Sequence, residues 1–107
     1  MEELETEIKK TVRRIFKREK RRLGVEAELD LRIESGWGPP IIGSNVYGQA
    51  FPFARPPRVW LEVYPEASKR EITMVVREEL LHIKYPQLSE EEIQRTLRKG
   101  LDPFESK

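Results

Sequence analysis

No stretch limits the architecture more than the one from Thr73 to Pro86, whose pattern is typical of a mostly buried helix. At about 100° per residue, its apolar side chains cover one broad arc and a second, nearly opposite patch. Glu78 and His82 lie between the two arcs, stacked four residues apart, and Glu79 falls inside the main apolar arc. A carboxylate that faces a core must be paired, hydrogen-bonded or metal-bound. Three titratable groups in this position therefore suggest a functional site.

A simpler interpretation of this helix has equal weight on spacing alone. A glutamate and a histidine four residues apart often form a solvated pair, and the single histidine of the chain is also compatible with a satisfied core residue. The local sequence favours a site, because Glu79-Leu80-Leu81-His82 matches the last four residues of the zinc-peptidase motif H-E-x-x-H. Glu78 stands where that motif has its first histidine.

The length of 107 residues fits one small domain, which we assign to residues 1–100, with 101–107 as a tail. Basic and acidic residues nearly balance at 20 and 19, so the net charge of +1 draws the whole protein toward neither nucleic acid nor membrane. The chain has no cysteine and no apolar run of membrane-spanning length. We therefore expect a cytoplasmic protein, and the abundance of Glu, Lys and Arg is typical of a thermophile.

The hydrophobic periodicity predicts an α+β domain. Pro57 and Pro65, which bracket its third strand, favour an edge position for that strand, because proline lacks a ladder donor. Gly24 is expected to end the first helix. Capping boxes at Ser68 and at Ser89 are expected to start the last two helices. In chain order the expected elements are a helix over 3–22, strands over 25–34, 44–50 and 58–64, and helices over 69–84 and 90–99.

The first helix has a very basic face, with nine Lys or Arg and a single Glu between Lys9 and Arg22. Such a face could grip phosphates. No glycine-rich loop or exposed aromatic platform accompanies it, so a solvated face is favoured and nucleic-acid binding is the less favoured alternative.

The element order, together with the Glu-Glu-Leu-Leu-His sequence and the Ser-Glu-Glu-Glu helix start, resembles the minigluzincins, a family of minimal zincin metallopeptidases made as zymogens. The resemblance covers nearly the whole chain by element order, although its specific motif is short. It implies a minimal zincin-like domain with an N-terminal helix, a small, mostly antiparallel sheet of about three strands with an edge strand, an active-site helix and a C-terminal glutamate helix. It also implies a Zn²⁺ cofactor and the hydrolysis of peptide bonds by metal-activated water.

Carried over by position, the resemblance makes His82 a zinc ligand and Glu79 the general base. Glu78 occupies a ligand position as a carboxylate, which zinc accepts, but its charge weakens the acidifying effect of the metal on bound water. Activity is therefore in question.

The third ligand is expected among the three glutamates that open the last helix. Glu92 is used by the capping box, and the helical wheel turns Glu90 toward the apolar side of its helix. The family spacing points instead to Glu91. Without any metal, the same three glutamates would interact favourably with the helix N-terminus.

The resemblance further implies that an extended peptide or protein substrate pairs with the edge strand around Trp60, Glu62 and Tyr64. It implies latency, with Asp102, Phe104 or Glu105 of the tail entering the cleft, or with exchange of C-terminal segments in a homodimer. The alternative functions are an inactive pseudo-peptidase or peptide-binding module and, less favoured, a nucleic-acid-binding protein.

Overall fold

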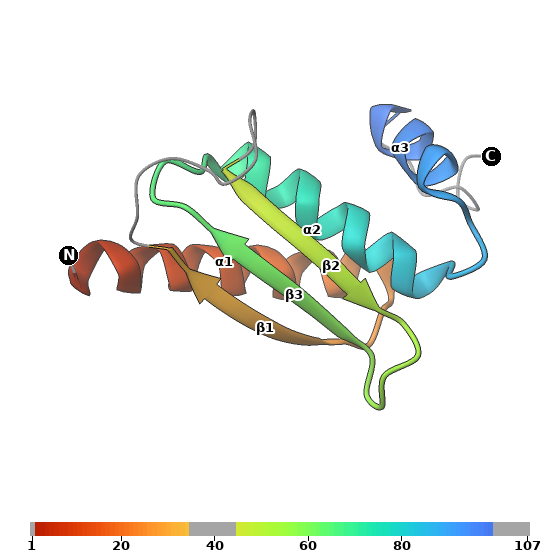
Figure 1. Ribbon diagram of the computed structural model, residues 1–107, viewed down its shortest axis with the longest axis horizontal. Coiled ribbons are helices and arrows are strands. Elements are labelled where there is room, and N and C mark those ends of the chain that lie inside the picture. The colour runs from red at the N-terminus through yellow and green to blue at the C-terminus, as the bar shows by residue number, and fades with distance from the viewer. Residues whose placement is uncertain (1, 35–44, 100–107) are drawn as a thin grey trace.

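The protein consists of three helices and a three-stranded sheet (Figure 1), and the computed structural model describes residues 2–34 and 45–99. The coarse α+β prediction is therefore confirmed. No helix within these two ranges is long and apolar enough to cross a membrane. The elements are α1 (Glu2–Leu23), β1 (Glu28–Ile33), β2 (Val46–Phe51), β3 (Arg58–Val63), α2 (Lys69–Lys84) and α3 (Glu90–Lys99).

The sheet is mixed rather than mostly antiparallel, with the strand order β1-β3-β2. β1 runs parallel to β3, and β2 runs antiparallel to it with Gly48 opposite Leu61. The prediction that β3 is an edge strand is wrong. Pro57 and Pro65 lie just outside the six residues of β3 and remove no donor from its ladders, so both sides of the strand are paired.

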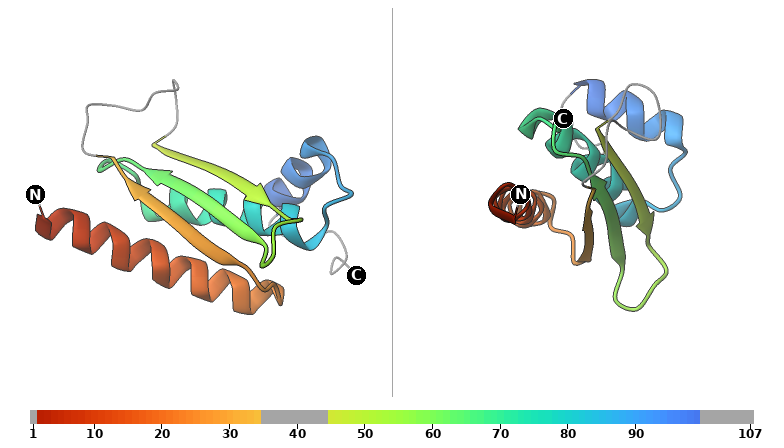
Figure 2. Two further views of the ribbon diagram at one scale, coloured as in Figure 1. Left: turned by 60° about the horizontal axis from the view of Figure 1, so that its bottom comes forward. Right: turned by 60° about the vertical axis from the view of Figure 1, so that its left-hand side comes forward.

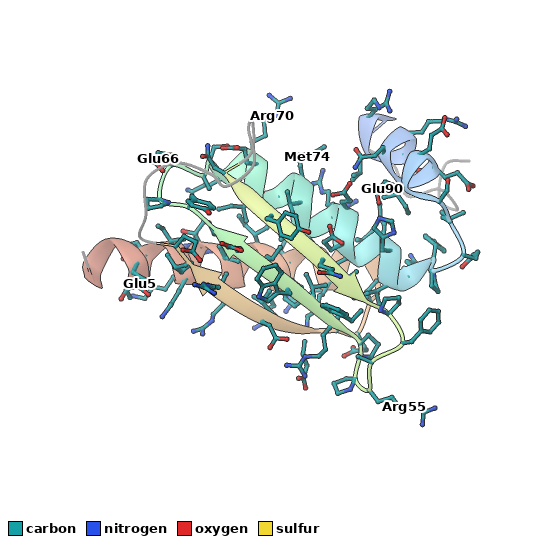
Figure 3. All side chains as sticks on the ribbon, in the orientation of Figure 1. Glu5, Arg55, Glu66, Arg70, Met74 and Glu90 are labelled. Atoms are coloured by element: carbon teal, nitrogen blue, oxygen red, sulfur yellow. The ribbon has the colours of Figure 1, made fainter. Side chains whose placement is uncertain are left out.

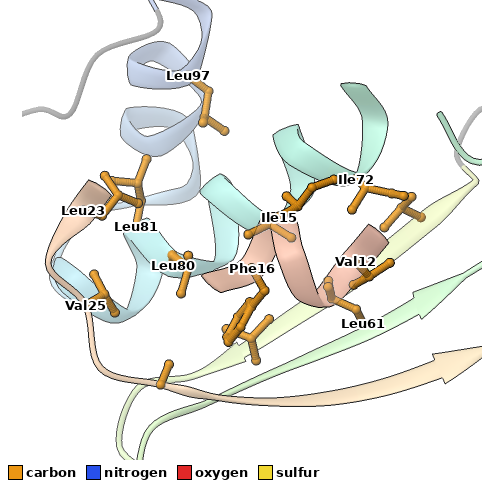
Figure 4. Close-up of a cluster of buried hydrophobic side chains, with 14 of the residues drawn as sticks. Val12, Ile15, Phe16, Leu23, Val25, Leu61, Ile72, Leu80, Leu81 and Leu97 are labelled. Atoms are coloured by element: carbon orange, nitrogen blue, oxygen red, sulfur yellow. The ribbon is translucent and has the colours of Figure 1, made fainter. Parts of the chain in front are cut away.

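Helices α1 and α2 cover the same face of the sheet (Figures 1 and 2). Alternation along β3 directs Val59, Leu61 and Val63 to this face, and all three are fully buried. Figure 4 shows Phe16 of α1 and Leu80 of α2 within the resulting core. The helix α3 packs against α2 only, among the elements that the structure describes.

Local signals fix the helix ends where the sequence places them. Gly24 follows α1 with a φ of +68°, a left-handed conformation that glycine adopts without strain. At the start of α2, the Glu71 amide donates to Ser68 Oγ at 3.0 Å and the Ser68 amide donates to Glu71 Oε1 at 2.9 Å. Ser89 and Glu92 form the same capping box at α3.

A buried carboxylate joins α1 to α2. Glu19 is 1% exposed and accepts hydrogen bonds from Arg77 of α2 at 2.6 Å and from Arg18 and Arg22 of α1 at 3.2 Å. Burial alone would raise the pKa of Glu19, but its hydrogen bonds and charge interactions with Arg77 and Arg22 together lower it. The only acid within the basic part of α1 thus faces inward and is neutralised by arginines.

Candidate active site

A cleft of about 540 Å³ lies between β2, α2 and the first residue of α3. Its polar wall comes from α2 and α3, and its opposite wall comes from β2. The lining residues are Val46, Tyr47, Gly48, Gln49, Ala50, Pro52, Val75, Glu78, Glu79, His82, Pro86 and Glu90.

Helix α2 presents three of the predicted site residues to this cleft. Glu78 and His82 are one helical turn apart and share a face, while Glu79 is turned further toward the sheet and is only 7% exposed. A carboxyl in this position keeps its place in the core only if polar partners surround it. The structure therefore brings Glu78, Glu79 and His82 together, as the periodicity indicated.

The first residue of α3 completes the group. Nε2 of His82 lies 2.7 Å from Oε2 of Glu90, and the other oxygen of Glu90 accepts a hydrogen bond from Gln94 at 3.1 Å. Figure 3 labels Glu90 at the end of α3 nearest to α2. Glu78 also hydrogen-bonds to Glu90. Glu90 is thus the residue through which α3 contacts the polar wall of the cleft.

The three neighbouring carboxyls shift one another's pKa values. Burial is the largest cause that raises the pKa of Glu78 to about 8, followed by its hydrogen bond to Glu90 and the charge of Glu79. Burial also raises the pKa of Glu79 to about 7, and His82 opposes this increase. The hydrogen bond from Glu78 lowers the pKa of Glu90. At neutral pH the proton therefore resides on Glu78, which donates to the ionised Glu90.

The outer edge of β2, which pairs with no other strand among the described residues, runs beside this group. Asn45 O accepts a hydrogen bond from the Tyr64 amide at 2.9 Å, so alternation along an antiparallel pair turns the peptide groups of Gly48 and Ala50 away from β3. A backbone hydrogen bond at Ala50 lowers the pKa of Glu79, which links this carboxyl to the strand edge. Helix α2 and strand β2 approach each other closely here. A Cβ added at Gly48 would lie only 2.7 Å from Val75 Cγ1.

Two groups of predicted residues lie away from the cleft. Glu91 points outward with 80% of its side chain exposed and lies 3.5 Å from Arg95, because the helical turn that directs Glu90 toward His82 directs its neighbour to solvent. Trp60 and Glu62 occupy the central strand, where Trp60 stacks edge-on against Tyr47 at 5.7 Å. The hydroxyl of Tyr64 hydrogen-bonds to Glu62.

The predicted inhibitory residues Asp102, Phe104 and Glu105 fall outside the residues that the structure describes.

Reasoning from the sequence names Glu90 as one of three candidates but prefers Glu91, and it misses Gly48 and Ala50. The helical wheel had a signal for Glu90, because it placed this residue on the inward side of α3, but the spacing of the resembled family was preferred. Gly48 and Ala50 carried no such signal, since their importance comes from the sheet order. That order depends on pairing between distant segments.

Within residues 2–34 and 45–99, no group of three or more His, Asp or Glu side chains is already arranged to hold a metal ion. The chain matches no family model, no curated protein and no solved structure. The geometry and chemistry of the cleft are thus the basis for inferring its function.

The proton on Glu78 gives a testable dependence of stability on pH. The pKa of Glu78 is about 8 in the folded protein against an ordinary 4.5, so the folded state binds this proton more tightly. The free energy of unfolding should therefore fall as pH rises from 4.5 to 8 and level off above 8. Glu78→Gln keeps a donor to Glu90 and cannot ionise, so we expect it to be more stable than the parent at pH 9, by on the order of 2 kcal/mol.

Urea unfolding of both proteins at pH 5 and pH 9 measures this difference. Glu91→Gln is the matched control on the exposed face of α3 and should change little at either pH. An equal stability of parent and Glu78→Gln at pH 9 would show that Glu78 ionises there without cost.

Proposed function

We propose that the cleft is a zinc-dependent peptidase site of the zincin type. The observation that carries the proposal is the contact of His82 with Glu90, 2.7 Å apart, next to Glu78 and Glu79 and beside the outer edge of β2. An imidazole, three carboxyls and a strand edge in one cleft are the components that peptide hydrolysis requires.

The donor set fits zinc by chemical type. Glu78, His82 and Glu90 supply two carboxylates and one imidazole, which zinc accepts in catalytic sites with three protein ligands. The three side chains are already within hydrogen-bonding reach through Glu90. Glu78 would have to lose its proton to act as a ligand. When bound, zinc would supply an acidified water and polarise the peptide carbonyl.

Glu79 is suited to proton transfer. Its pKa of about 7 lies near neutral pH, where a carboxylate can both take and return a proton. Its hydrogen bond with the backbone of Ala50 fixes the carboxyl next to the strand edge. An extended peptide that pairs with the outward-facing peptide groups of Gly48 and with the carbonyl of Ala50 would then pass in front of Glu79.

Zinc binding tests this proposal directly. The full-length protein, stripped with a chelator and titrated with zinc, should take up one ion per chain. His82→Ala should lose this site while retaining its fold, because His82 is 21% exposed and lies at the cleft rather than within the core. Uptake of less than one zinc per chain, or equal uptake by His82→Ala, would exclude the assigned ligands.

A second candidate is a peptide-binding module without catalysis. The hydrogen bond between Glu78 and Glu90 favours it, because these two carboxyls satisfy each other without a cation. This module would bind extended peptides equally well in the presence of excess chelator. The peptidase would instead require zinc for any cleavage.

A further inference from the structure

Helix α1 carries a row of five exposed cations on the side that faces away from the core. We call this row the cationic stripe; it consists of Lys10, Arg13, Arg14, Lys17 and Arg21. At 100° and 1.5 Å per residue, the five Cα positions fall within an arc of about 100° and extend over about 16 Å.

No hydrogen bond or ion pair to a side chain of the stripe occurs in the described part of the chain, whereas the side chains of the cations beside it have partners. Lys9 lies 3.6 Å from Glu5, and Lys20 donates to the carbonyl of Ala27 at 3.0 Å. Arg18 and Arg22 bind Glu19. The only acid between Lys9 and Arg22 is therefore directed into the core, and nothing within that segment offsets the charge of the stripe.

Such a row has a cost for the helix that presents it. Like charges three and four residues apart repel one another and reduce helix stability. The net charge of the whole chain is only +1, so the stripe is a local concentration of charge rather than part of a basic protein. A linear array of cations is complementary to a linear array of anions.

The geometry points to the phosphate backbone of duplex nucleic acid as the partner of the cationic stripe. A duplex offers about one negative charge per 1.7 Å of axis, so a 16 Å row can contact several phosphates at once. No aromatic side chain of α1 is exposed in the described structure, which removes the stacking platform that single strands require. Contacts of this kind position the protein without reading the sequence.

A membrane surface fits this helix less well. An interfacial helix inserts an apolar face between lipids. The apolar face of α1 is not available for insertion, because Val12, Ile15 and Phe16 are buried in the core. The stripe therefore has charge for an anionic surface, but α1 has no exposed apolar side chain to insert among those that the structure describes.

The stripe and the cleft lie on different parts of the molecule. Figure 2 shows α1 along the margin of the fold near β1, and the cleft is at β2, the opposite edge of the sheet. Binding at the stripe would leave the cleft open, so this inference is independent of the proposed peptidase.

The test is the binding of a labelled 25-base-pair DNA duplex of arbitrary sequence, followed by fluorescence anisotropy between 50 and 200 mM salt. Five phosphate contacts predict a slope of about −4.5 in log K against log salt, which is a loss of affinity of about 500-fold over this range. The triple variant Lys10→Gln, Arg14→Gln and Lys17→Gln should reduce the slope to about −2. Glutamine is a good helix former, so α1 should remain folded.

A matched control separates the stripe from general charge. Arg55→Gln, Arg70→Gln and Arg98→Gln remove the same three charges from exposed positions outside α1 and should leave the slope unchanged. Circular dichroism of both triple variants checks the fold.

Three outcomes overturn the inference: no binding at 50 mM salt, an equal loss in the control variant, or tighter binding to phosphatidylserine vesicles than to the duplex.

Discussion

Replacing Glu78 with histidine is expected to tighten zinc binding by about 10- to 100-fold at pH 7. The parent must release a proton held with a pKa of about 8 before Glu78 can act as a ligand, which costs about tenfold in affinity at pH 7. The ordinary pKa of histidine is about 6.5, so an imidazole releases its proton to zinc more readily than Glu78 does, and it is a favoured zinc ligand. The substitution also removes one negative charge beside Glu79, so a bound water would be more acidic.

Competition with a chromophoric chelator at pH 7 and pH 9 measures the effect. The difference between parent and variant should shrink at pH 9, where Glu78 is already ionised. Glu91→His introduces the same side chain on the exposed face of α3 and should bind zinc no better than the parent. A folded Glu78→His protein with unchanged zinc affinity would show that α2 does not carry a zincin site.

The same variant should cleave an unstructured protein substrate in the presence of zinc. Adding Glu79→Gln should abolish this cleavage while zinc remains bound, because the amide keeps the shape of the side chain and loses the base.

Replacing Glu19 with alanine is expected to destabilise the protein by about 3 kcal/mol at pH 7. The substitution removes the charge-assisted hydrogen bonds from Arg77 and Arg22 and leaves a cavity between α1 and α2. The arginines are 30% and 43% exposed and can reach water, which keeps the cost below that of a fully buried orphan charge. For a domain of this size, the loss is a large fraction of the total stability.

This effect should depend on pH in the opposite sense to that of Glu78. The pKa of Glu19 is lowered in the folded protein, so its contribution is complete above the ordinary value of 4.5 and is lost as pH falls through the folded pKa. Thermal unfolding of parent and Glu19→Ala at pH 7 and pH 3 should therefore show a smaller difference at pH 3. Glu5→Ala, which breaks only the exposed pair with Lys9, is the control and should have little effect. A Glu19→Ala protein as stable as the parent would mean that the arginines find equivalent partners in water.

Local chemistry was readable from the sequence, and long-range pairing was not. The capping boxes at Ser68 and Ser89 and the glycine after α1 predicted helix ends because each signal acts within a few residues. The grouping of Glu78, Glu79 and His82 followed from helical geometry alone.

The errors arose where distant segments meet. The prolines around β3 predict where the strand ends but not which strands pair with it. The parallel pairing with β1 makes β3 the central strand. The inward orientation of Glu19 could likewise not be predicted from the nine basic residues around it. That orientation depends on a hydrogen bond from Arg77, which belongs to another helix.

Within the part of the chain that the structure describes, α3 packs against α2 only, and this limits how firmly Glu90 is held at the cleft. In hydrogen exchange, elements with a single packing partner open at lower free energy than elements with several. Ile93 and Leu97 are the buried side chains that hold α3 in place, and Glu90 leaves the vicinity of His82 whenever α3 detaches. The full set of polar groups therefore exists only in the docked fraction of molecules. The equilibrium between docked and detached α3, a helix of ten residues, therefore determines which fraction of the molecules has Glu90 next to His82.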